Sequence, residues 1–220
     1  MWRQILEQRK NIITTFGNGS EWQSRVQIPR QSFWRNTTEI QKSGSRGTSG
    51  NYDAFMEPIT WFLTGMEKHS DSSRPDLCNN ADYFVNAITH HMSAMTTPSL
   101  QTAMNELSNH DHSRFLTRTN HMTGRVEHLG HEAAESYTNS AILREAVVMQ
   151  MTWPGAPTIY YGDEAGVCGF TDPDNRRTYP WGHEDKEMIE FHKEVIAIHK
   201  RYWAFRTGSV KMLMWQEGVL

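Results

Sequence analysis

The chain has 220 residues, 37% of them hydrophobic, and a formal net charge of −3. This length suffices for one large domain or two small ones with a sizeable core, and the near-neutral charge excludes a general attraction to nucleic acid or to a membrane surface. Two cysteines exclude a disulfide framework, no apolar run reaches the ~20 residues of a membrane span, and the start shows no signal-peptide pattern, so we expect a cytoplasmic protein.

Residues 1–50 differ in composition from the rest of the chain. They carry eight Lys and Arg residues and three Glu residues, which gives a net charge of +5. Residues 51–220 carry fourteen Lys and Arg residues and twenty-two Asp and Glu residues, which gives a net charge of −8. They show no helical or strand periodicity, and TTEIQKSGSRGTSG has the composition of a linker. One interpretation is therefore a basic, disordered arm.

A second interpretation is that residues 1–50 are largely an out-of-frame translation. Codons permitted for residues 30–49 can be read one base earlier as AIILAEHYGDPEKWLQGDEW, which contains the apolar, strand-like run that the printed residues lack. A sequencing error or a pseudogene would explain such a segment. The underlying nucleotide sequence tests this hypothesis, because codons incompatible with the second reading would exclude it.

From Asn51 onward the pattern becomes regular. Residues 52–65 predict a short helix that ends at Gly65, and residues 79–95 predict an amphipathic helix. Residues 99–107 predict a strand, which leads directly into the polar cluster ELSNHDHSRF at residues 106–115. The first polar cluster is thus expected at the end of a strand.

The second half of the chain repeats this alternation. Residues 132–153 predict a buried helix, and Thr158–Tyr161 predict a strand that is followed by a long polar loop. An amphipathic helix is expected from Asp185, which is a plausible N-cap, and SVKMLMW from Ser209 predicts the first strand of a further domain. Alternating strands and helices predict an α/β fold with parallel strands, in which ligands bind at the carboxyl ends of the strands.

The polar cluster admits three interpretations. His110 and His112 could ligate a metal, but no HExxH spacing or paired cysteine supplies further ligands. The cluster could also be a capped turn whose groups satisfy one another. A site for a polyhydroxylated ligand fits better, because Asp111 can accept from two hydroxyls, His110 can donate to one of them, and Arg114 can hold a carboxylate in register.

The loop after Tyr161 contains side chains that are also suited to binding a polyhydroxylated ligand. Asp172 and Arg176 lie four residues apart, with Pro173 stiffening the start of the loop. Flat apolar surfaces for sugar rings are supplied by Tyr160, Tyr161, Tyr179 and Trp181. Both loops follow predicted strands, so we expect them at the same edge of the sheet.

Two segments resemble conserved motifs of the alpha-amylase family of retaining glycoside hydrolases. ELSNHDHSR resembles its fourth conserved segment, F/L-x-x-N-H-D-x-x-R. PGAPTIYYGDEAGVCGFTDPDNRRTYPW is similar to its last segment, G-x-P-x-x-Y-Y-G-x-E, followed by the D-P-x-x-R loop usual in the cyclomaltodextrinase, neopullulanase and maltogenic amylase branch and in oligo-glucosidases. The resemblance implies that residues 51–205 are the C-terminal part of a (β/α)8 barrel and that residues 206–220 begin a C-terminal β domain.

The resemblance also implies an activity and residue roles. The family cleaves α-glucosidic bonds with retention, so maltodextrins, cyclodextrins and related α-glucans are the implied partners, with no cofactor and no metal ligand in this chain. Asp111 would be the third family carboxylate, His110 its hydrogen-bonding companion, and Asp172 and Arg176 would bind glucose units further from the cleavage point. Glu164 matches a structural acid. Asp111 is accordingly expected to face the 172–176 turn across a glucose-sized gap.

The resemblance also identifies what the printed chain lacks. The family's nucleophile lies in a segment like G-x-R-x-D and its general acid in a segment like A-E-x, and neither is printed. The shifted reading contains A-E-H, whose acid would be encoded across Arg35 and Asn36. We therefore expect the chain alone to be inactive and, as a partial barrel, prone to aggregate. A non-catalytic carbohydrate-binding protein is the alternative.

Overall fold

A computed structural model describes residues 53–213, with side chains from Glu57 onward. Residues 1–50, for which we predicted a disordered arm or an out-of-frame segment, lie outside the described residues. The last seven residues of the predicted C-terminal β domain also lie outside them. In the part of that domain that is described, residues 209–213 form no strand. No helix between residues 53 and 213 is long and apolar enough to cross a membrane.

Two helices open the described chain and pack against each other. Helix α3 spans Asp53–Thr64 and ends, as predicted, at Gly65, whose φ of +63° gives the left-handed conformation typical of a residue after a helix. Helix α4 spans Ala81–Ser93 and begins at Asn80, whose side chain accepts from the Tyr83 N–H. The buried rings of Phe62 and Phe84 join the two helices, with centroids 5.1 Å apart.

A parallel pair of strands precedes the two polar loops. Strands β1 (Met104–Asn105) and β2 (Ala156–Pro157) pair with Met104 opposite Ala156. The first is shorter than the predicted 99–107, because residues 97–102 form helix α5. The second prediction is wrong in position, because the ladder ends before Thr158–Tyr161, apart from the Thr158 N–H that donates to the Asn105 carbonyl. Within the described residues each strand has one neighbour, which limits the length over which a ladder can form.

The connection between β1 and β2 contains the main buried helix. Helix α8 spans Ser140–Thr152, is capped by the Asn139 side chain and buries Leu143, Ala146, Val147, Val148 and Met151. The predicted start at residue 132 is wrong, because residues 131–134 form the 3-10 helix η2 and a turn follows them. The short helices α6 (Phe115–Arg118) and α7 (Val126–Leu129) precede η2.

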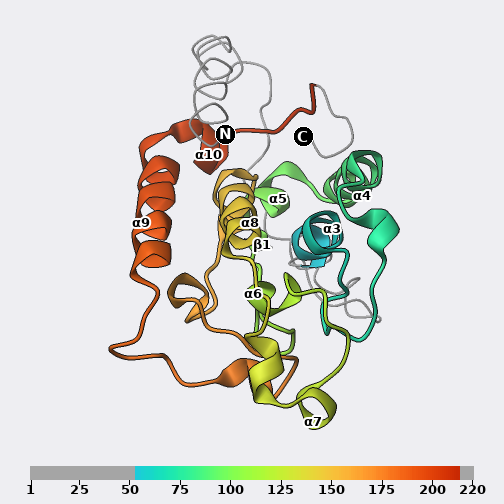
Figure 1. The fold of residues 1–220 in the computed structure, drawn as a ribbon. Coiled ribbons are helices and arrows are strands. Elements are labelled where there is room, and N and C mark those ends of the chain that lie inside the picture. The colour runs from blue at the N-terminus through green and yellow to red at the C-terminus, as the bar shows by residue number, and fades with distance from the viewer. Residues whose placement is uncertain (1–52, 214–220) are drawn as a thin grey trace, which may run out of the picture. The chain divides into compact units, whose positions relative to one another are not determined.

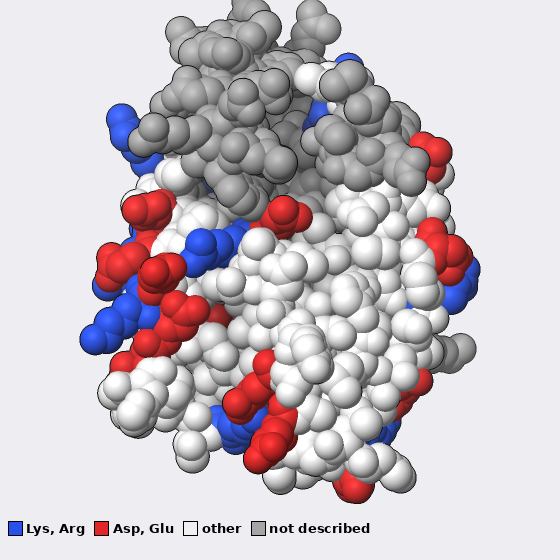
Figure 2. Space-filling model, in the orientation of Figure 1, with Lys and Arg blue, Asp and Glu red and all other residues white. Residues whose placement is uncertain are grey.

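The last long helix packs beside α8 (Figure 1). Helix α9 spans Lys186–Arg201, and the predicted N-cap is confirmed because the Asp185 carboxylate accepts from the Met188 N–H at 2.9 Å. Met188, His192 and Val195 form its buried face, and Figure 2 shows acidic and basic side chains gathered over α9. Its amphipathic sequence pattern therefore corresponds to one buried and one exposed side.

The remaining elements are short. They are η1 (Pro75–Leu77), η3 (Asp163–Ala165), η4 (Asp174–Arg176) and α10 (Trp203–Thr207). Helices α6 and α7 and the loop after β2 lie together at one end of the described residues, beyond the carboxyl ends of the strands (Figure 1). The described chain is thus an α/β arrangement in which both predicted polar loops lie at the same edge of the parallel strands.

Candidate functional site

The first loop is shaped by the buried side chain of Asn109. Its Oδ1 accepts from the backbone N–H groups of Asp111 at 2.9 Å and His112 at 3.0 Å, and its Nδ2 donates to the buried Glu106 carboxylate at 2.9 Å. This is an Asx turn, in which a side chain replaces a backbone partner. The turn leaves the side chains of His110 and Asp111 exposed by 66% and 57%.

The second loop binds directly to the backbone of the first. The Asp111 carbonyl accepts from the Thr171 hydroxyl at 2.6 Å and lies 3.5 Å from the Asp172 N–H, while Arg176 Nε donates to the His110 carbonyl at 3.2 Å. The predicted proximity of the two loops is therefore correct. The backbone of the first loop, however, is hydrogen-bonded directly to the second loop, so no glucose-sized gap separates them at these residues.

Asn175 holds the two loops together from inside. It is fully buried, and its Nδ2 donates to the carbonyls of Asn109 at 3.1 Å and His112 at 2.7 Å. Gly169 permits the tight turn beneath, because a Cβ there would collide with the Asp174 carbonyl. Neither residue was singled out by the sequence, and the hydrogen bonds of Asn175 cross more than sixty residues, so they have no local sequence signature.

Arg114 lies beneath this surface. Its side chain is 0% exposed, and it donates to the Asp163 carboxylate at 2.9 Å, the Tyr161 carbonyl at 2.6 Å and the Asn175 carbonyl at 2.8 Å. Its guanidinium also stacks on the Tyr160 ring, 4.0 Å from the centroid. Arg114 does hold a carboxylate, as its chemistry suggested, but a residue with no exposed surface does not contact a ligand here.

The partner of Arg114 has a perturbed protonation equilibrium. Burial raises the pKa of Asp163, while the Arg114 guanidinium and hydrogen bonds from Ser108 and Arg114 oppose that rise. The pair is thus a buried charge pair, for which loss of one partner is costly. Glu164 next to it accepts from the Gly162 N–H at 2.9 Å, consistent with a structural acid.

A third segment, not anticipated from the sequence, reaches the site. The His69 ring nitrogen Nδ1 lies 2.9 Å from the Thr171 hydroxyl, whose proton is donated to the Asp111 carbonyl, so the hydroxyl accepts from His69. The His69 ring also meets the buried His112 ring edge-on at 5.0 Å. Burial, with the charge of Arg118, lowers the pKa of His112 to about 3, so His112 is neutral at pH 7.

Four of the five predicted site residues are exposed together above these contacts. His110 Nε2 lies 3.5 Å from Asp111 Oδ1, and Arg176 Nε lies 2.7 Å from Asp172 Oδ1. The two pairs are linked by the bond from Arg176 to the His110 carbonyl. They present carboxylate acceptors next to imidazole and guanidinium donors, which is the combination that neighbouring hydroxyl groups require.

The geometry disfavours the metal interpretation. His110 is exposed, whereas His112 is only 3% exposed, so the two imidazoles do not share a face. Over residues 57–213, no three or more His, Cys, Asp or Glu side chains are grouped so that they could hold a metal ion. The predicted pair of ligands is therefore not brought together.

The aromatic residues divide into two groups. Tyr160 and Tyr161 both lie against the Arg114 guanidinium, and the Tyr161 hydroxyl donates to the Arg177 carbonyl, so these rings mainly support the loops. Trp181, by contrast, is 79% exposed and lies against Tyr179, with ring centroids 4.5 Å apart. Trp181 thus offers more open ring surface than Tyr161, which is 41% exposed.

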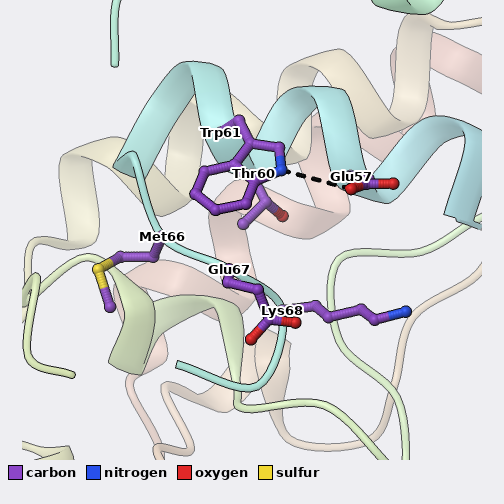
Figure 3. A pocket seen from close by; sticks show the side chains of 6 residues that line it. All are labelled: Glu57, Thr60, Trp61, Met66, Glu67 and Lys68. Atoms are coloured by element: carbon purple, nitrogen blue, oxygen red, sulfur yellow. Dashed lines mark hydrogen bonds between the residues drawn. The ribbon is translucent and has the colours of Figure 1, made fainter. Parts of the chain in front are cut away.

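Two hollows adjoin these segments. One, lined by Glu57, Thr60, Trp61, Met66, Glu67 and Lys68, holds about 30 Å³ (Figure 3), which is room for water and too little for a sugar ring. The other is an open groove of about 490 Å³, lined by Val126, His131, Pro173, Asp174, Arg176, Arg177 and Thr178. The second has the size of a ligand site and shares Arg176 with the exposed pairs.

A parallel β–α–β unit with polar loops beyond its strands defines an α/β protein whose ligands bind at that edge. Residues 51–213 match the family model of the alpha-amylase catalytic domain. The chain belongs to the alpha-amylase family, as its motifs predicted. The catalytic domain of this family is a (β/α)8 barrel, so the described elements are part of such a barrel.

Similar proteins and a similar solved structure agree with this family assignment. Amylopullulanase of Thermoanaerobacter thermohydrosulfuricus is 40% identical over 124 residues, which are 53% of this chain and 8% of that protein. Neopullulanase 2 of Thermoactinomyces vulgaris is 34% identical over 134 residues, 60% of this chain and 20% of that protein. The debranching enzyme of Nostoc punctiforme superposes with a TM-score of 0.60 at 28% identity, covering 75% of this chain and 32% of the other. The chain thus spans a minor part of each.

Proposed function

We propose that the chain is part of a retaining glycoside hydrolase that acts on the α-glucosidic bonds of maltodextrins, cyclodextrins or related α-glucans. The observation that carries this proposal is the direct bonding of the N-H-D loop to the D-P-D-N-R loop, with His110, Asp111, Asp172 and Arg176 exposed above the junction. Membership of the alpha-amylase family supports the same chemistry.

Each exposed residue has a role that its contacts permit. Asp111 accepts hydrogen bonds from neighbouring hydroxyls of the glucose unit being cleaved, and His110 donates to the same unit. Asp172 and Arg176 bind a glucose unit further along the chain, because their mutual ion pair at 2.7 Å leaves the remaining carboxylate oxygen and the guanidinium Nη groups for a ligand. Arg114 acts from below as a positioning residue.

Catalysis requires two further carboxyl groups about 5 to 5.5 Å apart, one as nucleophile and one as general acid. No segment of residues 51–220 resembles the family motifs that carry them, so we propose that this chain alone binds α-glucans without cleaving them. The alternative function, a non-catalytic carbohydrate-binding protein, is supported by the same two loops, which carry the proposed sugar-binding residues in a range where no motif for the catalytic pair is recognised.

The test uses the purified full chain and maltotriose. We expect saturable binding that Asp111→Ala abolishes and that Glu190→Gln, an exposed carboxylate on α9, leaves unchanged. Incubation with maltodextrin should release no reducing sugar, and release would contradict the proposed inactivity. The nucleotide sequence encoding residues 30–49 decides the origin of the first segment. If the chain binds no maltotriose, the proposed role of the two loops is wrong.

A further inference from the structure

His69 belongs to a short segment whose shape is fixed by its own bonds. The Glu67 carboxylate accepts from the His69 N–H at 2.8 Å, and the Glu67 N–H donates to the Ser72 carbonyl at 3.0 Å. The segment is tied to the first loop by the Ser113 N–H, which donates to the Lys68 carbonyl at 3.0 Å. The His69 ring is therefore placed beside the candidate site by contacts that do not involve the ring itself.

The two bonds of the Thr171 hydroxyl determine which ring nitrogen of His69 carries a hydrogen. A hydroxyl has one proton, and the Asp111 carbonyl, which can only accept, lies 2.6 Å from the Thr171 oxygen. That bond uses the proton, so His69 Nδ1, which lies 2.9 Å from the same oxygen, is the donor in the other bond. Neutral His69 is thus the Nδ1–H tautomer.

The direction of this bond decides what the Asp111 carbonyl receives. With the hydrogen on Nε2 instead, Nδ1 of His69 would be an acceptor and would compete with the Asp111 carbonyl for the Thr171 proton. The Asp172 N–H, which also points to this carbonyl, is 3.5 Å away, at the limit of a hydrogen bond. The donor at His69 therefore directs the shorter of these two bonds to the Asp111 carbonyl.

The carboxylate of Asp111 depends on the backbone that carries it. Its side chain is 57% exposed and lies 3.5 Å from the exposed ring of His110, whereas the backbone bond from Thr171 comes from a residue that is 5% exposed. We propose that His69 is a positioning residue for Asp111: its Nδ1–H directs the Thr171 hydroxyl to the Asp111 carbonyl and so orients the carboxylate toward the glucose unit. This proposal rests on the proposed function and adds to the site a residue from outside both motifs.

Two substitutions of equal size separate the donor from the ring. In His69→Asn the amide can donate to Thr171, whereas in His69→Asp the carboxylate can only accept and draws the hydroxyl proton away from Asp111. Calorimetry on the full chain should show that His69→Asn binds maltotriose within about twofold of the wild type and that His69→Asp binds it roughly fivefold to tenfold more weakly, since one hydrogen bond of the loop is lost. An equal loss in both variants would overturn the proposal, because the ring would then act only by filling space.

His121 provides the matched control. Its Nδ1 also bonds to an oxygen, the Thr64 carbonyl at 2.8 Å, but this bond leads to α3 and not to either loop. His121→Asn and His121→Asp should therefore bind maltotriose as the wild type does. A loss in His121→Asp as large as that in His69→Asp would overturn the specific role of His69.

Thr171 supplies a second pair of variants if those at His69 do not fold. Thr171→Val removes the hydroxyl at nearly constant size and should weaken maltotriose binding as much as His69→Asp, whereas Thr171→Ser keeps the hydroxyl and the affinity. Unchanged affinity in Thr171→Val would overturn the proposal.

Nitrogen NMR of isotope-labelled histidine reads the tautomer directly, at about pH 8, where an ordinary histidine is neutral. His69 should carry its hydrogen on Nδ1, and a hydrogen on Nε2 would overturn the proposal. If Asp111→Ala abolishes maltotriose binding while His69→Asp leaves it intact, the proposal is wrong and the proposed function stands. If the wild type binds no maltotriose, both are wrong.

Discussion

The two loops of the candidate site consist of a buried layer and an exposed layer with opposite properties. In the buried layer, Asn109, Arg114 and Asn175 are at most 6% exposed and bond mostly to backbone groups of the two loops. In the exposed layer, His110–Asp111 and Asp172–Arg176 are about half exposed and bond mainly to each other. The comparison separates the residues that build the surface from those available to a ligand, although both kinds lie within the same two motifs.

The largest expected effect comes from removing the buried cation. Arg114→Met should lower the free energy of unfolding by about 3–5 kcal/mol, because it removes the cation that pairs with the buried Asp163 carboxyl. The exposed counterpart Arg176→Met should cost less than about 1 kcal/mol. Denaturant unfolding of both variants measures the difference. Equal losses would show that the division into two layers is wrong.

The Asn109 turn should have the next largest effect. Asn109→Ala removes the acceptor of two backbone N–H groups and a donor to Glu106, so we expect a loss of about 2 kcal/mol. Asn139→Ala is the matched control, because that exposed side chain caps α8 with a single bond, which is worth about 1 kcal/mol. A loss at Asn109 no larger than that at Asn139 would contradict a building role for the Asx turn.

The exposed layer could be predicted from the sequence more fully than the buried one. The motifs identify Asp111, Asp172 and Arg176 directly, and the strand–helix alternation brings their loops to one edge. The buried layer depends on contacts such as the Thr171 hydroxyl with the Asp111 carbonyl, between segments sixty residues apart. The segment that carries His69 has no motif, and its role is visible only once the chain is folded.

The strands show a similar limit. An apolar run such as Thr158–Tyr161 has the composition of a strand, but a strand also requires a neighbour, and within the described residues each of the two strands has a single partner. Helix α9 was predicted closely because its cap and its buried face are local properties of its own sequence. Features set by local chemistry were thus predictable, and features set by distant partners were not.

A pH measurement tests the buried layer at His112. Its pKa falls from 6.5 to about 3 on folding, so the unfolded chain binds a proton below pH 6.5 that the folded chain does not. The contribution of His112 to the free energy of unfolding is therefore fully present above pH 6.5 and decreases toward pH 3, by up to about 1.4 kcal/mol per pH unit. Unfolding of the wild type and His112→Asn at pH 7 and pH 5 isolates this contribution. The same pH dependence in both proteins would exclude His112 as its source.

The smallest effect on stability, with a large effect on binding, is expected at Asp111. Asp111→Asn preserves the shape of a side chain that is 57% exposed, and the contacts that fix the loop here use its backbone carbonyl and N–H, which the substitution retains. The free energy of unfolding should change by no more than about 0.5 kcal/mol. Maltotriose affinity should fall roughly tenfold or more, because a charged acceptor contributes about 1.5–3 kcal/mol to a hydrogen bond. An Asp111→Asn variant that lost stability and kept its maltotriose affinity would contradict the assignment of Asp111 to the exposed layer that binds the ligand.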